Sequence, residues 1–349
     1  MFSLARPSTS SLFATPAKLA PGLLLTGGLA ALAFALRTLP GVSVLSPMIL
    51  ALLLGVAVHN LAGTPASTLP GITFSLKRLL RLGIVLLGLQ LTAAQLAAIG
   101  GTGLFIVAAV LAATFFVTVR LARPLGVPRP LAELIAAGTS VCGASAILAA
   151  NSVSRARQED VAYAIACITL FGSLSMALFP LLLPILALEP QAYGLWAGAA
   201  VHEVAQVVAT AFQGGQEAGE FGTVAKLARV LLLAPLILAM GWAARRRASN
   251  AGEGGGSVPF PLFVVGFLAM VGVNSLIGVP EALAPWTTGL TSFLLTMALA
   301  AMGLGMNIRA LRAQGLRPLA LAGISWIFVS TLSLALILLL FTGGTALPA

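Results

Sequence analysis

The sequence predicts an all-α membrane protein of about eleven spanning helices, built as two inverted five-helix repeats behind one extra N-terminal helix. The 349 residues are 59% hydrophobic and only 8% charged, whereas soluble domains are roughly 45–50% apolar and about 25% charged. Apolar runs of spanning length recur along the chain, and two of them are interrupted at their centres by small and polar residues. These features favour a polytopic protein with broken helices.

The apolar runs follow a tail, residues 1–20, that is rich in Ser, Thr and Pro and is not expected to be a cleaved signal peptide. A spanning helix needs roughly 20 apolar residues. Runs near this length lie at 21–38, 46–62, 75–97, 101–121, 129–151, 158–187, 192–213, 222–244, 259–277, 284–312 and 316–341.

Lysine and arginine residues alternate between the two sides of this predicted chain. Fourteen of the 19 fall on the side of the N-terminus, and the other five are Arg37, Arg155, Arg157, Lys226 and Arg229. Because cytoplasmic loops collect basic residues, we expect a multi-pass protein of the cell inner membrane with a cytoplasmic N-terminus and an extracytoplasmic C-terminus. The net charge of +10 is therefore a topology signal, and a nucleic acid partner is not expected.

The first interruption lies in the stretch from Glu133 to Asn151. In hydrocarbon, unwound backbone is tolerated only where protein buries it or it lines a polar cavity. A second half-helix starting near Gly143 would present free N–H groups and a positive dipole end, which favours a bound anion. The predicted substrate-binding residues here are Gly138, Thr139, Ser140, Cys142, Gly143 and Ser145.

An internal repeat supports this interpretation. The segment LGVAVHN at 54–60 matches AGAAVHE at 197–203, so His59 and His202 occupy equivalent positions. We therefore predict repeats at residues 46–187 and 192–341, with the extra N-terminal helix at 21–45. Because five is an odd number, the second repeat must be inverted relative to the first.

The second interruption lies in the tenth run. Gly303, Gly305, Met306 and Asn307 are its predicted substrate-binding residues, with Asn307 as the N-cap of a second half-helix that faces the first. A single glycine cluster is more typical of close helix packing. Two clusters at equivalent positions favour a midplane transport site.

Four segments resemble the YeiH-type membrane proteins, a family named for sulfate export: GTSVCGASAI, EDVAYAIACITLFGSLSMALFP, WAGAAVHEVAQVV and KLARV, at 138–147, 159–180, 196–208 and 226–230. The resemblance implies an inverted-repeat transporter related in architecture to bile acid:sodium symporters and sodium/proton antiporters. It also implies sulfate as a substrate.

Ionisable groups within spans are rare and are functional hypotheses by default. On a continuous seventh helix His202 and Gln206 would share one face, with Glu203 beside it. His202 or Glu203 could carry a coupling proton and Gln206 could contact substrate, or the three could form a polar lock between helices; both alternatives stay open. His59 has no acidic neighbour and is predicted to be structural.

Two basic pairs open apolar runs in equivalent positions. Lys226 and Arg229 are predicted near the extracellular start of the eighth run, where they would attract anions. Arg78 and Arg81 are their cytoplasmic counterparts, for which an interfacial role is as plausible.

Two further polar groups have structural interpretations. Glu133 is predicted to pair with Arg129 at a helix start. Cys142 is predicted to be a small filler, and with Cys167 it implies no disulfide framework.

The sequence thus predicts a secondary transporter for a small anion, sulfate or a related oxyanion or sulfonate, that works by alternating access. One alternative is a sodium- or proton-coupled organic-anion symporter. A remote one is an intramembrane metalloprotease, since His202–Gln206 is one residue short of HExxH. No enzymatic activity, metal or cofactor is expected. The expected partners are the anion, a coupling H⁺ or Na⁺ and the bilayer, and a homodimer is left open.

Overall fold

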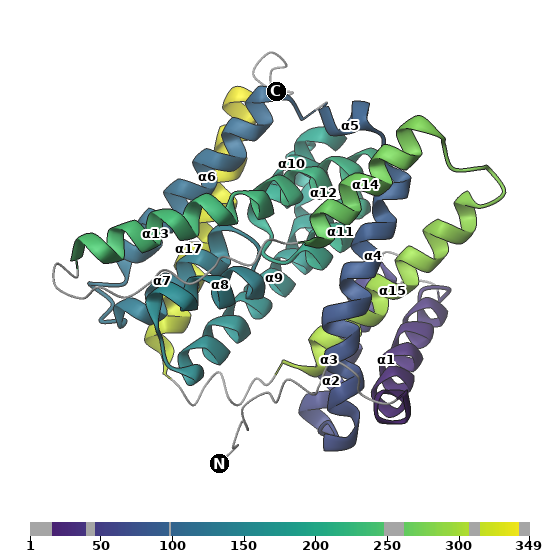
Figure 1. The fold of residues 1–349 in the computed structure, drawn as a ribbon, viewed down its shortest axis with the longest axis horizontal. Coiled ribbons are helices and arrows are strands. Elements are labelled where there is room, and N and C mark those ends of the chain that lie inside the picture. The colour runs from purple at the N-terminus through teal and green to yellow at the C-terminus, as the bar shows by residue number, and fades with distance from the viewer. Residues whose placement is uncertain (1–15, 40–45, 98, 248–261, 307–314, 342–349) are drawn as a thin grey trace. The chain divides into compact units, whose positions relative to one another are not determined.

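The computed structural model describes residues 16–39, 46–97, 99–247, 262–306 and 315–341, and within these ranges every regular element is helical (Figure 1). The all-α prediction is therefore confirmed. In this described part of the chain, six helices are long and apolar enough to cross a membrane: Ala17–Leu36, Gly100–Leu121, Gln158–Leu186, Gln216–Ala244, Ala284–Leu304 and Leu316–Leu340. The count of eleven crossings is not confirmed, and the boundaries of the repeats stay predictions.

The chain forms two compact units. Unit 1 comprises Met1–Gly83 and Gly289–Gly305, and unit 2 comprises Ile84–Thr288 and Met306–Ala349. Unit 1 contains α1 (Pro16–Leu36), α2 (Pro47–Leu61), η2 (Ala66–Thr68), α3 (Leu69–Phe74), η3 (Ser75–Leu79), the start of α4 (Leu80–Leu87) and most of α15 (Ala284–Leu304).

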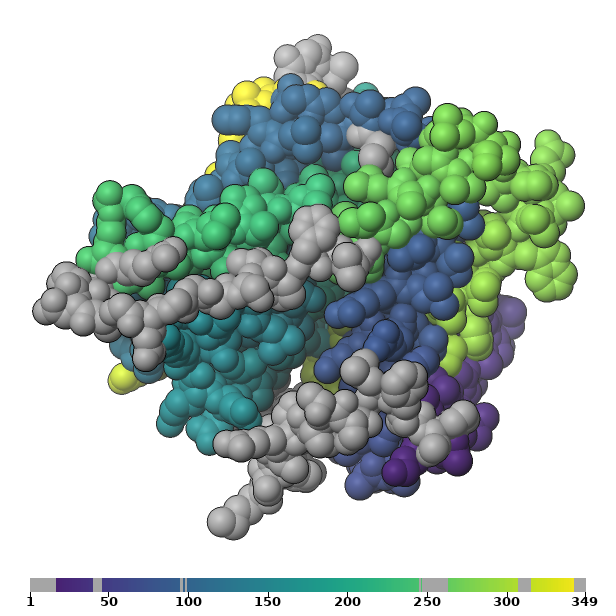
Figure 2. Space-filling view, viewed as in Figure 1, coloured from purple at the N-terminus to yellow at the C-terminus, as the bar shows by residue number. Residues whose placement is uncertain are grey.

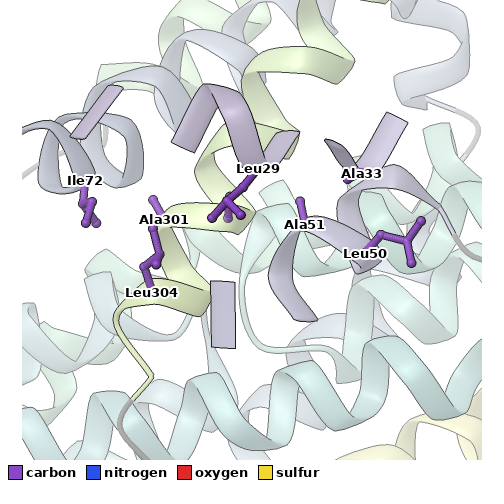
Figure 3. Close-up of a cluster of buried hydrophobic side chains, with 8 residues drawn as sticks. Leu29, Ala33, Leu50, Ala51, Ile72, Ala301 and Leu304 are labelled. Atoms are coloured by element: carbon purple, nitrogen blue, oxygen red, sulfur yellow. The ribbon is translucent and has the colours of Figure 1, made fainter. Parts of the chain in front are cut away.

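The core of unit 1 is apolar and joins four helices (Figure 3). Its buried members are Leu29 and Ala33 of α1, Leu50 and Ala51 of α2, Ile72 of α3, and Ala300, Ala301 and Leu304 of α15. The many alanines let the helix backbones approach closely, which is how helices associate in a membrane, where lipid is as apolar as leucine.

Gly303 has a packing role in this core. It lies inside α15 and faces Gly55 of α2, and a Cβ on Gly55 would overlap the carbonyl oxygen of Ala300. The alternative of close helix packing therefore describes Gly303 better than a place in a break. α15 does end at Leu304, followed by Gly305, but Asn307 and its half-helix lie outside the described residues.

Unit 2 holds the remaining helices. They are η4 (Gly88–Gln90), α5 (Ala93–Ala97), α6 (Gly100–Leu121), α7 (Arg129–Ser140), α8 (Ala144–Ser154), α9 (Gln158–Leu186), α10 (Pro190–Ala200), α11 (Val204–Ala211), η5 (Phe212–Gly214), α12 (Gln216–Leu231), α13 (Leu233–Arg247), α14 (Leu262–Leu276) and α17 (Leu316–Leu340).

α7 and α8 form a helical hairpin that returns to the side where it began. The Ser154 hydroxyl at the end of α8 donates to Glu133 Oε2 near the start of α7, at 2.7 Å. Gly138 leaves room for the Ile147 side chain between the two helices. With 12 and 11 residues, at about 1.5 Å per residue each helix reaches roughly half the depth of a bilayer core. The predicted crossing by residues 129–151 is therefore wrong, because a three-residue turn reverses the chain.

α10 and α11 form a second hairpin. The Tyr193 hydroxyl near the start of α10 donates to the Thr210 carbonyl near the end of α11, at 3.2 Å. The predicted continuous helix over 192–213 is interrupted at residues 201–203, so His202 and Gln206 do not share a helix face. The 29-residue α9 joins the two hairpins and is long enough to cross the bilayer. The hairpins consequently enter from opposite ends of unit 2.

We predict that Gly55→Ala destabilises the protein by about 1–3 kcal/mol, because the added methyl group overlaps backbone of α15. The measurement is the thermal unfolding midpoint of the purified chain in detergent. Gly28→Ala on α1 is the control, because a Cβ there has nothing within 4 Å, and it should be neutral or stabilising by up to about 1 kcal/mol. Equal effects of the two substitutions would contradict the close contact between Gly55 and the backbone of α15.

The hairpin of α7 and α8 predicts which loops share a membrane face. Cysteines replacing the exposed Arg123 and Gln158 should react with a membrane-impermeant maleimide from the same side, and a cysteine replacing Glu189 should react from the other. A chain that crossed once between 129 and 154 would instead expose residues 123 and 158 on opposite faces.

Candidate functional site

The tips of the two hairpins meet inside unit 2. We call this site the tip junction: Val141–Gly143 from the first hairpin, Val201–Glu203 from the second, and Lys226 and Arg229 from α12. Four half-helix ends converge here, two amino ends and two carboxyl ends. Each needs hydrogen-bond partners, because a membrane interior supplies no water to take their place.

The first tip depends on Gly143. Its φ of +69° is a conformation that side chains disfavour, and its N–H donates to the Gly138 carbonyl at 3.0 Å, which closes the turn after α7. A Cβ at this position would also fall on the Glu203 side chain. Glycine is therefore required both for the turn and for the approach of the second tip.

Glu203 caps two helices with one carboxylate. Its Oε1 accepts from the N–H of Ala144, the first residue of α8, at 2.7 Å. It is also the N-cap of α11, in a capping box where the Glu203 N–H donates to Gln206 Oε1 at 3.2 Å and the carboxylate accepts from the backbone of Gln206. The amino ends of α8 and α11 therefore share one internal anion.

Lys226 and Arg229 serve the two carboxyl ends. Lys226 Nζ donates to the carbonyls of Val141 and Val201, both at 2.7 Å. Arg229 donates to the carbonyls of Thr139 and Ser140 in α7, at 2.7 and 3.1 Å, and through Nη1 to those of Gly198 and Val201 in the second hairpin, at 3.1 and 3.2 Å. Both side chains are fully buried.

The signs of these charges match the helix dipoles. Cations lie at the carboxyl ends and an anion at the amino ends, and each such contact is worth about 0.3–2 kcal/mol, with hydrogen bonds to charged groups contributing about 1.5–3 kcal/mol. Burying three ions is costly unless such bonds offset the desolvation. If all three side chains are ionised, the junction carries one excess positive charge.

The predicted position of Lys226 and Arg229 is wrong. They are the eleventh and fourteenth residues of α12, about 15 to 20 Å along the helix from its start, and they bind backbone carbonyls rather than facing an entrance. The equivalent pair, Arg78 and Arg81, is exposed, as an interfacial role requires. The break in the second hairpin, which was not predicted from the sequence, creates the carbonyls that the buried pair satisfies.

The other predicted residues of the first hairpin have varied surroundings. The hydroxyls of Thr139 and Ser140 are buried with no hydrogen-bond partner among the described residues, so they do not cap the helix ends at the break. Ser145 is exposed in the first turn of α8. Cys142 is buried in the tip as a free thiol, as is Cys167 within α9.

The polar residues of the second hairpin divide into bonded and unbonded groups. Gln206 Nε2 donates to the Thr169 carbonyl and the Ser173 hydroxyl of α9, at 3.2 and 3.3 Å, so it fastens the hairpin to that helix. His202 is fully buried, and neither ring nitrogen has a partner among the described residues. An unpaired buried imidazole is costly and calls for water, a proton or a ligand.

One structural interpretation is confirmed, because Arg129 Nε pairs with Glu133 Oε1 at 2.9 Å at the start of α7. His59 Nδ1 lies 2.7 Å from the Thr64 hydroxyl, a local contact at the end of α2, and its structural role stays a prediction.

The second break has a sequence signal that the prediction used differently. Glu203 followed three residues later by Gln206 is the spacing of a capping box, which marks a helix start. It was interpreted as a near match to HExxH. The backbone acceptors of Gly198, Val141 and Val201 carry no side-chain signal, so they could not be found from residue types.

Comparisons with known proteins agree across most of the chain. A family model described as "Conserved hypothetical protein 698" matches residues 21–322. UPF0324 membrane protein PA5383 of Pseudomonas aeruginosa is 40% identical over 338 residues, covering 91% of this chain and 95% of that protein. The chain belongs to the UPF0324 membrane protein family.

Further UPF0324 relatives come from distant bacteria. The Corynebacterium glutamicum membrane protein Cgl0015/cg0018 is 37% identical, over 93% of this chain and 94% of its own, and a Bacillus cereus relative is 33% identical, over 86% and 89%. The YeiH-type resemblance is confirmed, because it concerns this family. Membership establishes a membrane protein.

The UPF0324 chain offers little for a zinc site in the part that the structure describes. No three His, Cys, Asp or Glu residues there are grouped as ligands. His59 and His202 lie in different units.

We predict that Lys226→Met lowers the unfolding midpoint strongly, because the Val141 and Val201 carbonyls lose their donor at a cost of about 1–3 kcal/mol each. Thermal unfolding of the full chain in detergent measures it. Lys77→Met, at an exposed lysine, is the matched control and should change little. Similar shifts for both variants would mean that the junction does not need its cation.

Proposed function

We propose that this UPF0324 protein is a secondary transporter of a small anion, rather than an enzyme, and that the tip junction is its transport site. The observation that supports the proposal is the meeting of two opposed hairpins at buried charged groups. Broken helices and intramembrane ions are expensive, and transporters use them to build midplane sites. A protein whose helices served packing alone would not need them.

The charge of the junction favours an anionic substrate. Lys226 and Arg229 outnumber Glu203, and α8 directs its amino end toward the same place. Ser145, exposed in the first turn of α8, offers a hydroxyl beside those amides. Sulfate, sulfite and small sulfonates present several acceptor oxygens to such donors. Sulfate is the first substrate to test, since the YeiH-type relatives are named for its export.

Glu203 is the proposed coupling residue. Its carboxylate holds the two helix amino ends that an incoming anion would use. Protonation would weaken these bonds and release the amides, so an anion and a proton could bind together. His202, buried beside it with no hydrogen-bond partner among the described residues, is the second candidate for the proton. Uptake that requires Na⁺ instead of a pH gradient would favour the cation-coupled symporter.

The orientation of unit 2 follows from its charges. Arg123, Arg129 and Arg157 lie at the end where α7 and α9 begin, whereas residues 187–216 at the other end contain no Lys or Arg. The positive-inside rule then assigns the arginine end to the cytoplasm. Arg155 and Arg157, predicted outside, move to the cytoplasmic side. If two of the eleven predicted crossings are hairpins, nine crossings are left. Nine is still an odd number, so in this proposal the two termini lie on opposite sides of the membrane, with the N-terminus in the cytoplasm.

Flux into proteoliposomes tests the proposal. We expect the wild-type chain to transport radiolabelled sulfate, sulfite or a small sulfonate, and we expect Ser145→Trp to abolish that flux. Because Ser145 is exposed, its substitution should leave the free energy of unfolding within about 0.5 kcal/mol of the wild-type value. Ser152→Trp, also exposed and about two turns further along α8, is the control and should retain flux.

Two outcomes contradict the proposal. One is a wild-type chain that transports none of these anions, whether the inside of the proteoliposome is more acidic or more alkaline than the outside. The other is a Ser145→Trp variant as active as Ser152→Trp, which would place the substrate away from the junction.

A further inference from the structure

A groove runs along unit 2 away from the tip junction. We call it the lateral groove; it lies between α6, α7 and α13, with a volume of about 510 Å³. Alanines spaced four residues apart, 108 and 112 on α6 and 239 and 243 on α13, leave the space open. Figure 2 shows α13, in green, on the surface of unit 2 that faces the viewer.

The lining of the lateral groove is apolar along most of its length. Phe115, Leu236 and Met240 contribute to it, and Trp242, whose side chain is half exposed, lies near one end. Its volume falls within the range of small-molecule sites, roughly 300–1,000 Å³. A lipid-facing apolar groove of a membrane protein has no water to fill it, so hydrocarbon is its natural content.

One end of the groove is basic. Arg129 lines it, with its side chain 47% exposed. Arg246 lies with Cζ 3.6 Å from the Trp242 ring centroid, and Arg120, next to the lining residue Val119, lies with Cζ 5.1 Å from the ring of Phe116. These contacts hold two guanidinium groups by cation–π interaction.

Among the described residues that line the groove, Glu133 is the one that is acidic. Its two oxygens accept from Arg129 and from Ser154, so it neutralises one arginine and leaves two positive charges. This end is where α6 ends, α7 begins and α13 ends, which places it at a bilayer surface. Basic pockets between membrane helices at such a surface bind lipid phosphates.

We propose that the lateral groove binds an anionic phospholipid, with one acyl chain along α6 and α13 and the headgroup phosphate against Arg120, Arg129 and Arg246. The proposal does not depend on the transported substrate. It assigns the apolar lining and the arginines to one ligand, whereas a neutral lipid would leave the two unneutralised charges without a partner.

Fluorescence quenching by brominated phospholipids tests the proposal, because bromine quenches a tryptophan ring on contact and Trp242 lines the groove. The full chain is reconstituted in phosphatidylcholine with increasing mole fractions of dibrominated phosphatidylglycerol or dibrominated phosphatidylcholine. Subtracting the signal of Trp242→Phe removes the contribution of the other three tryptophans. Half-maximal quenching of Trp242 should need several-fold less phosphatidylglycerol than phosphatidylcholine.

Substitutions separate the headgroup from the chain. The double variant Arg120→Gln with Arg246→Gln should lose the preference for phosphatidylglycerol, roughly fivefold for each arginine, while still being quenched by both lipids. Arg317→Gln, an exposed arginine of the same unit that does not line the groove, should keep the preference. Ala239→Phe, which fills the groove, should reduce quenching by both lipids.

Equal quenching of Trp242 by the two lipids in the wild-type chain would overturn the proposal and indicate an unselective lipid shell. So would a preference that survives in the double arginine variant. Absence of quenching by either lipid would mean that protein, such as a second copy, covers the groove, and would overturn it as well.

Discussion

Four interrupted helix ends lie in the interior of unit 2, and three charged side chains supply the bonds that water would give them elsewhere. Glu203 takes two amino ends, and Lys226 and Arg229 take two carboxyl ends. These bonds from charged side chains, in place of bonds to water, permit hairpins where spanning helices were expected. Without them each tip would leave unpaired amides and carbonyls in a low dielectric, at several kcal/mol per group.

The bond from Glu203 also affects whether the amino end of α8 is free to bind an anion. The amino end of α8 is already occupied by a carboxylate from the other hairpin. In the proposed transporter, a substrate anion would have to share the amides at this helix end with Glu203 or displace its carboxylate, so its binding would depend on the charge of that one side chain. Selectivity between anions would then compare each anion with a carboxylate rather than with water.

Composition and run length were enough to predict an all-helical membrane protein, and the glycine-rich stretch after Glu133 was enough to predict the first break. The reversal of the chain at Gly143 was not predictable, since a broken span and a hairpin share one hydropathy pattern. Only the structure shows it, through the contact of Ser154 at the end of α8 with Glu133 near the start of α7. The second break was missed because Val201–Glu203 lies among alanines and valines that suit a helix equally well. Lys226 and Arg229 were predicted to attract anions, but the groups they bind are backbone carbonyls, which no residue type reveals.

Lys226 and Arg229, which join the two tips, are also the last parts of the site to be synthesised. The Val141 carbonyl accepts from the Lys226 side chain, which is synthesised 85 residues later. At a synthesis rate of about 5–20 residues per second, that interval is roughly 4 to 17 seconds. During biogenesis the first hairpin must therefore stay outside the hydrocarbon, or be sheltered by the insertion machinery, until α12 arrives to complete it.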